Sequence, residues 1–98
     1  MEIVIINCKI KKNNKTQLYQ TLESLQPSIR SHCKEFELKI NQNNSLFMEI
    51  IFESHESFEK NFYNNEFNIL KGTLKSLCED VIIKVNDSLE NNKEKLTD

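Results

Sequence analysis

The order of its apolar periodicities is the feature that most limits what this 98-residue chain can fold into. Apolar residues at every second position mark a strand, and apolar residues at every third or fourth position mark a helix. Residues 3–10 are β-branched or apolar on both faces, which is typical of a strand covered on both sides. From Lys15 to Ser31, apolar residues recur at spacings of four, three and four, which predicts a helix with a kink or a restart at Pro27.

A hairpin follows this helix. Residues 34–41 alternate strictly between apolar and charged side chains, which predicts a strand with one buried face. The polar run 41–45 is rich in asparagine and therefore favours a tight turn. Residues 46–53 then predict the second strand of the hairpin, with large apolar groups on both faces.

A second helical region and a last strand complete the pattern. Ser54 suits a helix N-cap, and Asn64–Asn65 is expected to break the helix that follows it. Residues 81–85 predict the final strand. The order predicts an α+β fold, a ferredoxin-like β-α-β-β-α-β sandwich with both helices on one face of an antiparallel sheet. We expect the domain to span residues 1–87 and residues 88–98 to form a loose polar tail.

The far face of this predicted sheet carries too much apolar surface to lie in water. A chain of this length buries only about 60 to 65% of the surface that its unfolded form exposes, so a partner subunit would add stability. Packing the sheets of two copies face to face covers both patches with one symmetric contact. We therefore expect a homodimer through the sheet face, in which these side chains are covered: Ile3, Ile5, Phe47, Ile51 and Ile82.

Charge and cysteine content argue against several classes of protein. The formal net charge of −2 gives no electrostatic case for nucleic acid or for an anionic membrane. The apolar run at the start of the chain is too short for a signal peptide or a membrane span, so we expect a cytoplasmic protein. The cysteines Cys8, Cys33 and Cys78 include no CxxC pair, which argues against a disulfide framework and a zinc site. His32 beside Cys33 raises the alternative of a metal-binding or nucleophilic pair, but neighbours in an extended segment point apart.

Several segments resemble the antibiotic biosynthesis monooxygenase family of dimeric α+β barrels. Phe47–Ser54 resembles the third strand of that family with its W-E-S exit, and His55–Phe67 resembles the next helix with its S-P-H-F-like break. The His32–Cys33 entry into the second strand is similar to the family's G-C turn. The resemblance covers residues 2–86 and implies a dimeric α+β barrel that binds a small apolar or aromatic molecule.

The same resemblance implies candidate site residues. Members of the family include cofactor-free oxygenases of polyketide aromatics, haem-degrading enzymes and proteins that act on small signalling molecules. The oxygenases resemble one another in an Asn on strand one, a Trp ending strand three and a His near the second helix. Asn7 matches the first, whereas Phe52 stands at the Trp and Glu66 at the His. Lys71 stands where haem-degrading members present their iron ligand, and a protonated lysine is no ordinary axial ligand, so haem degradation is disfavoured.

Two functions remain open. The first is a cofactor-independent monooxygenase that acts on a small aromatic or quinone-like substrate and in which the Asn7 amide polarises the substrate oxygen. The second is a non-catalytic dimeric module of the same fold, which binds a small ligand or serves a structural role, with Asn7 bonded to a neighbouring backbone group. A substrate pocket would lie between helices and sheet and have these walls: Phe52, Phe67, Leu70 and Leu74.

Two other classes share this order of elements. An RNA-recognition motif needs an aromatic residue where Val4 stands, and basic, glycine and aromatic residues in a pattern that residues 45–52 do not offer. A regulatory amino-acid-binding domain usually has a glycine-rich loop after its first strand, whereas residues 11–14 contain no glycine. Both classes are therefore disfavoured.

Overall fold

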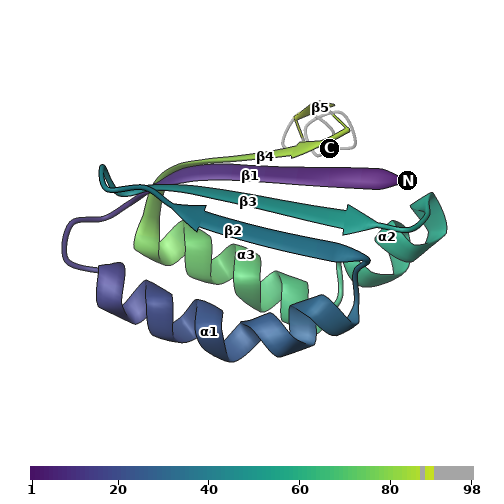
Figure 1. Ribbon diagram of the computed structural model, residues 1–98, viewed down its shortest axis with the longest axis horizontal. Coiled ribbons are helices and arrows are strands. Elements are labelled where there is room, and N and C mark those ends of the chain that lie inside the picture. The colour runs from purple at the N-terminus through teal and green to yellow at the C-terminus, as the bar shows by residue number, and fades with distance from the viewer. Residues whose placement is uncertain (87, 90–98) are drawn as a thin grey trace.

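The computed structural model, which describes residues 1–86 and 88–89, has helices on one face of an antiparallel sheet (Figure 1). The strand order is β2-β3-β1-β4-β5, which places β1 at the centre. Helices α1 and α3 cover one face, and α2 lies beyond the end of β3. The predicted ferredoxin-like α+β fold is confirmed, with its second helix divided in two. The elements are β1 (Glu2–Ile10), α1 (Lys15–Ser31), β2 (Glu35–Ile40), β3 (Ser45–Phe52), α2 (His55–Asn61), α3 (Asn65–Leu77), β4 (Cys78–Val85) and β5 (Ser88–Leu89).

Capping side chains divide the second helical region as the sequence predicts. The Ser54 hydroxyl accepts a hydrogen bond from the backbone N–H of Ser57 at 3.0 Å and starts α2. The Asn64 side chain accepts one from the backbone N–H of Phe67 at 3.1 Å and starts α3. Both caps satisfy amide protons that have no partner within a first helical turn. The predicted break at Asn64–Asn65 is therefore confirmed.

Helix α1 has the predicted bounds but passes through Pro27 without a restart. Its buried stripe runs through Leu18, Leu22 and Ile29 and so continues on both sides of the proline. Pro27 itself is exposed. Burial of this stripe outweighs the missing backbone hydrogen bond, so the helix does not restart at Pro27, and the alternative of a kink there stays a prediction.

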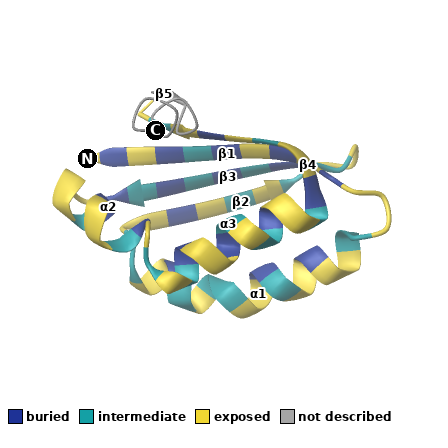
Figure 2. Cartoon of the chain, turned by 180° about the vertical axis from the view of Figure 1, so that it is seen from behind, coloured by how far each residue is buried: buried dark blue, intermediate teal, exposed yellow. Residues whose placement is uncertain are grey.

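The core lies between the helices and one face of the sheet. Buried and exposed residues alternate along β1, as Figure 2 shows. On β2 only the face with Phe36 is covered, as the strict alternation predicts. The strand residues of the core that are buried completely or almost completely are Val4, Ile6, Leu46, Met48, Ile50 and Phe52.

The opposite face of the sheet is open in the single chain. Ile3 is 37% exposed and Ile82 is 44% exposed, while Ile5, Phe47 and Ile51 are half-buried. The register places Ile3 opposite Ile51. These apolar side chains therefore lie on adjacent strands, as the sequence predicts, and we call them the open-face patch.

A β-bulge interrupts the pairing of β1 with β4. Asn7 pairs with Ile82 but Lys9 pairs with Glu79, so both Asp80 and Val81 stand opposite Cys8. Asp80 has a φ of 54°, in the left-handed region that asparagine and aspartate tolerate better than most residues. The bulge thus places an acidic side chain at the edge of the open face, close to Asn7.

The chain continues beyond β4 into a short fifth strand. Val85 pairs with Ser88, so Ser88–Leu89 adds one more strand to the sheet. The rest of the predicted tail, residues 90–98, lies outside the described residues, as does Asp87. Among the helices that the structure describes, none is long and apolar enough to cross a membrane.

Candidate functional site

The four predicted pocket walls lie together, but as packed core. Phe52 ends β3, and Phe67, Leu70 and Leu74 face it from α3, all with no exposed surface. The Phe52 and Phe67 ring centroids are 5.6 Å apart, a distance typical of aromatic pairs in contact. Phe58 of α2 approaches the Phe52 ring edge-on at 5.6 Å. Close-packed rings therefore fill the space between sheet and helices where the sequence analysis expects a ligand.

Asn7, the predicted polarising residue, lies on the other side of the sheet. It is exposed on the open face, between Phe47 of β3 and Ile82 of β4. A hollow of about 260 Å³ beside it is lined by Asn7, Cys8, Lys9, Ser45, Leu46 and Asp80. The sheet thus separates Asn7 from the four predicted walls, and these five residues do not form one site.

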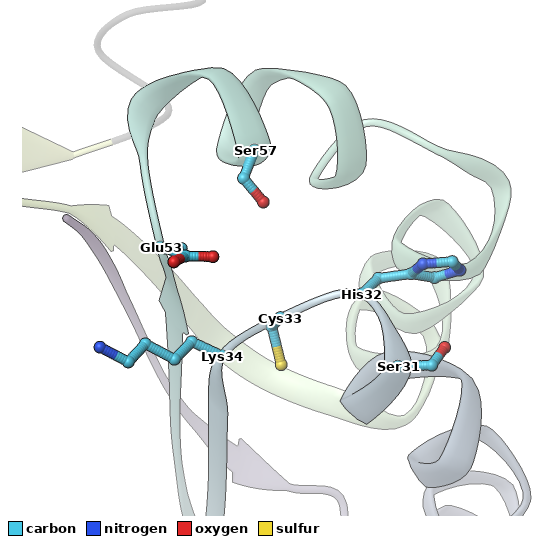
Figure 3. A pocket seen from close by; sticks show the side chains of 6 residues that line it. All are labelled: Ser31, His32, Cys33, Lys34, Glu53 and Ser57. Atoms are coloured by element: carbon cyan, nitrogen blue, oxygen red, sulfur yellow. The ribbon is translucent and has the colours of Figure 1, made fainter.

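A second hollow lies at the end of the core, between the α1–β2 connection and the start of α2 (Figure 3). Its volume is about 300 Å³, and it borders the core through Cys33, which packs against it. Glu53, directly after β3, and Ser57, in α2, face it from the opposite side. Its lining residues are Ser31, His32, Cys33, Lys34, Glu53 and Ser57. We call this space the Cys33 hollow.

His32 and Cys33 do not form the metal-binding or nucleophilic pair that their adjacency in the sequence raises as an alternative. In Figure 3 the His32 ring points away from the hollow on one side and Lys34 points away on the other. The Glu53 carboxylate and the Ser57 hydroxyl point inward. Asn61 donates to the backbone oxygen of Ser57 at 2.9 Å and to its hydroxyl at 3.4 Å, which holds this side of the hollow in place.

Burial keeps the Cys33 thiol neutral. It raises the pKa of Cys33, and the nearby Arg30 charge only partly opposes that rise. A protonated thiol is a weak nucleophile and a poor metal ligand. Cys33 therefore borders the hollow as a small neutral residue, and in Figure 3 its sulfur points away from Glu53 and Ser57.

Glu53 and Ser57 were not predicted from the sequence as site residues. Glu53 was interpreted only as the last residue of a strand and as part of the W-E-S-like exit. The distance between the α1–β2 connection and α2 depends on tertiary packing, which no local pattern encodes. The sequence offers only an indirect signal. Cys33 directly precedes β2 and Glu53 directly follows β3, so pairing of these two strands brings the two residues to the same end of the sheet.

A polar network ties the start of β1 to α2. The His55 imidazole Nδ1 lies 2.8 Å from a Glu2 carboxylate oxygen, and its Nε2 lies 3.3 Å from Glu59. Asn86 donates to the other Glu2 oxygen. The hydrogen bond with His55 lowers the pKa of Glu2 the most, and Asn86 lowers it further, against the opposing effect of burial. The His55 side chain is 65% exposed and also fixes this corner of the fold.

Lys71 and Glu66, the two remaining positions that the family resemblance singles out, both lie on α3. Lys71 Nζ lies 4.3 Å from the Phe62 ring centroid and 4.6 Å from that of Tyr63, within the range of a cation–π contact. Glu66 is half-buried in the first turn of α3. Within residues 1–86 and 88–89, no three or more His, Cys, Asp or Glu side chains come together as a metal site would require.

Solved structures share this fold at low sequence identity. Rv0793 from Mycobacterium tuberculosis has a TM-score of 0.74 and 14% identity, covering 86% of this chain and 90% of its own. An antibiotic biosynthesis monooxygenase has a TM-score of 0.75 and 15% identity, covering 90% and 98%. A candidate antibiotic biosynthesis monooxygenase from Deinococcus radiodurans has a TM-score of 0.76 and 14% identity, covering 90% and 92%. The antibiotic-biosynthesis-monooxygenase-like fold implied by the sequence is thereby confirmed.

Sequence comparisons add nothing to this likeness. No model of a known protein family matches the chain, and no curated protein matches it in sequence. The comparisons therefore establish the fold alone.

Proposed function

We propose that the chain is a homodimeric protein that binds a small molecule in the Cys33 hollow. The observation that carries this proposal is the hollow itself, whose volume of about 300 Å³ lies at the lower end of the range for small-molecule sites. Inward-facing polar groups from Glu53 and Ser57 stand over a floor backed by packed core. A rigid floor with a few placed polar groups is the usual composition of a small-molecule site.

The open-face patch supports the homodimer. Its apolar side chains lie on the three adjacent strands β3, β1 and β4, while acidic Glu37 and Glu49 stand opposite one another on β2 and β3. Lys39 and Lys84 lie on the same face. A two-fold contact lets the apolar centre cover its own copy and brings opposite charges within reach of each other.

Light scattering after size-exclusion chromatography tests the dimer. The wild-type chain is expected to elute as a dimer, and Ile82→Glu as a monomer, because a carboxylate in the centre of the contact would be buried without a partner. Ile69→Glu is the matched control, since Ile69 is 54% exposed on α3 and lies outside the open-face patch. A monomeric wild type at high micromolar concentration contradicts the dimer.

Binding in the Cys33 hollow is tested with a library of small soluble fragments and amide chemical shifts. Fragments that bind are expected to shift the amide resonances of Cys33 and Ser57 more than those of the open face. If no fragment shifts these two resonances at millimolar concentration, the hollow is not a binding site and the proposal fails.

A cofactor-independent monooxygenase is the second candidate function. The fold shared with proteins named antibiotic biosynthesis monooxygenases favours it. The Asn7 amide lies in a hollow on the open face, and a second copy packed on that face would exclude water from it. It ranks second because the four predicted walls of its substrate pocket are closed core.

Oxygen uptake with small phenols and quinols tests this second candidate. A monooxygenase that uses Asn7 is expected to lose turnover in Asn7→Ala while it keeps its dimer and its stability. Absence of uptake by the wild type, or full activity of Asn7→Ala, removes the role of Asn7 as a polarising residue.

A cytoplasmic location is part of the proposal. Cys8, Cys33 and Cys78 are free thiols, which is the usual state of cysteines in a reducing compartment.

A further inference from the structure

The groups that face the Cys33 hollow carry negative or neutral charge. The Glu53 carboxylate and the Ser57 hydroxyl point into it, while the two basic side chains, His32 and Lys34, point away on opposite sides. A carboxylate and a hydroxyl can both accept hydrogen bonds, and only the carboxylate carries charge. The polar side of the hollow therefore suits a donor with a positive charge better than an anion.

The carboxyl end of α1 adds to this preference. This 17-residue helix ends at Ser31, and Ser31 and His32 both line the hollow. The carboxyl end of a helix carries a partial negative charge that favours a nearby cation. Arg30, the basic residue of the last turn, lies over the Phe36 ring at 5.2 Å, on the β2 side.

The floor of the hollow favours an apolar portion of the ligand. Cys33 packs against the core, and its burial keeps the thiol neutral. A space of about 300 Å³ accommodates a molecule of about ten non-hydrogen atoms, at the small end of ligand sites.

From this arrangement we infer that the Cys33 hollow binds a small primary amine with an apolar body, its ammonium group against Glu53 and Ser57. This inference rests on the proposed function and names the chemical class of its ligand. The ammonium donates to the Glu53 carboxylate and to the Ser57 hydroxyl oxygen, and the apolar body lies on Cys33. The helix end at Ser31 stabilises the charge from the side.

Three probes of nearly equal shape separate charge from size: benzylamine, benzyl alcohol and benzoate. Each is titrated into the full chain while the amide resonances of Cys33, Glu53 and Ser57 are followed. Benzylamine is expected to bind about two- to five-fold more tightly than benzyl alcohol, because Glu53 is exposed and an exposed ion pair contributes up to about 1 kcal/mol, where 1.4 kcal/mol would be tenfold in affinity. Benzoate is expected to bind most weakly.

Two substitutions complete the test. Glu53→Gln is expected to weaken benzylamine binding about two- to five-fold and to leave benzyl alcohol unchanged, since Gln keeps the shape and removes the charge. Glu56→Gln is the matched control, because Glu56 is exposed in the first turn of α2 and does not line the hollow.

The outcomes separate the inference from the proposed function. If benzyl alcohol or benzoate binds as tightly as benzylamine, or if Glu53→Gln and Glu56→Gln behave alike, the preference for an amine is wrong while the hollow remains a binding site. If none of the probes shifts the three resonances, the inference is overturned. The proposed binding function fails with it only if the fragment library also leaves the Cys33 and Ser57 resonances unshifted.

Discussion

Replacing Phe52 with alanine separates a packed core from a ligand cleft. Phe52 has no exposed surface, and its ring lies 5.6 Å from Phe58, 6.2 Å from Phe62 and 5.6 Å from Phe67, measured between centroids. Truncation removes one ring from a cluster of four and leaves a void that its neighbours fill only in part. A residue that walls an open cleft would leave no such void, since water already reaches one side of it.

The expected cost of this change is large. Phe-to-Ala changes in packed cores cost about 3–5 kcal/mol, and a domain of this size has a total of about 5–15 kcal/mol. Phe52→Ala is therefore expected to remove about a fifth or more of the free energy of unfolding. Phe52→Leu retains most of the apolar volume and is expected to cost about 1–2 kcal/mol, which keeps a folded protein available if the alanine variant unfolds.

Urea unfolding followed by circular dichroism measures both losses, at one protein concentration because a dimer makes stability concentration-dependent. Ile69→Ala provides the control, since truncation of this exposed side chain is expected to change stability by about 0.5 kcal/mol or less. A loss below about 1 kcal/mol in Phe52→Ala would refute the packed-core interpretation. It would restore Phe52 as a wall of a substrate pocket.

Three further measurements test other parts of the structure. Glu2→Gln is expected to destabilise the protein at neutral pH, because the His55 hydrogen bond lowers the pKa of Glu2 and so stabilises the folded state. The difference in free energy of unfolding from wild type should shrink as the pH falls below 4.5, the ordinary pKa of a glutamate, and through the lower pKa of Glu2 in the folded state. An unchanged difference in urea unfolding down to about pH 3 would contradict this. Asn64→Ala is expected to cost about 1 kcal/mol through loss of the α3 cap, and a loss below about 0.3 kcal/mol in the same assay would be too small for a cap. Ellman's reagent is expected to modify Cys33 before Cys8 in the folded protein, since Cys8 is only 6% exposed and burial raises its pKa strongly; equal rates, assigned by mass spectrometry, would contradict the burial of Cys8.

The sequence predicts the elements well where local signals agree with tertiary packing. The apolar spacing places α1 within its observed bounds, and Ser54 and Asn64 start helices because their side chains can accept from nearby amide protons. Periodicity also separates the two faces of the sheet. It does not decide between a kink and a restart at Pro27, because packing on both sides of the proline determines whether the helix continues.

The candidate site is less predictable than the fold. The apolar residues Phe52, Phe67 and Leu70 could equally line a pocket or fill a core. Only their burial and the distance between the Phe52 and Phe67 rings in the structure show that they fill a core. Strand alternation assigns Asn7 to the face of Ile3 and Ile5, whereas the predicted pocket walls lie on the face that the helices cover. The Cys33 hollow joins segments that lie about twenty residues apart, and such a meeting depends on the complete fold.

The β-bulge at Asp80 determines which changes in chain length β4 can accept. Side chains on a strand alternate between faces, so loss of a single residue normally turns every later side chain to the wrong side. Asp80 is the extra residue of the bulge, and without it Val81 alone would stand opposite Cys8 while Ile82 would still pair with Asn7. Its deletion would also remove a left-handed backbone conformation. The chain can therefore lose this one residue while the inward and outward sides of the strand stay the same.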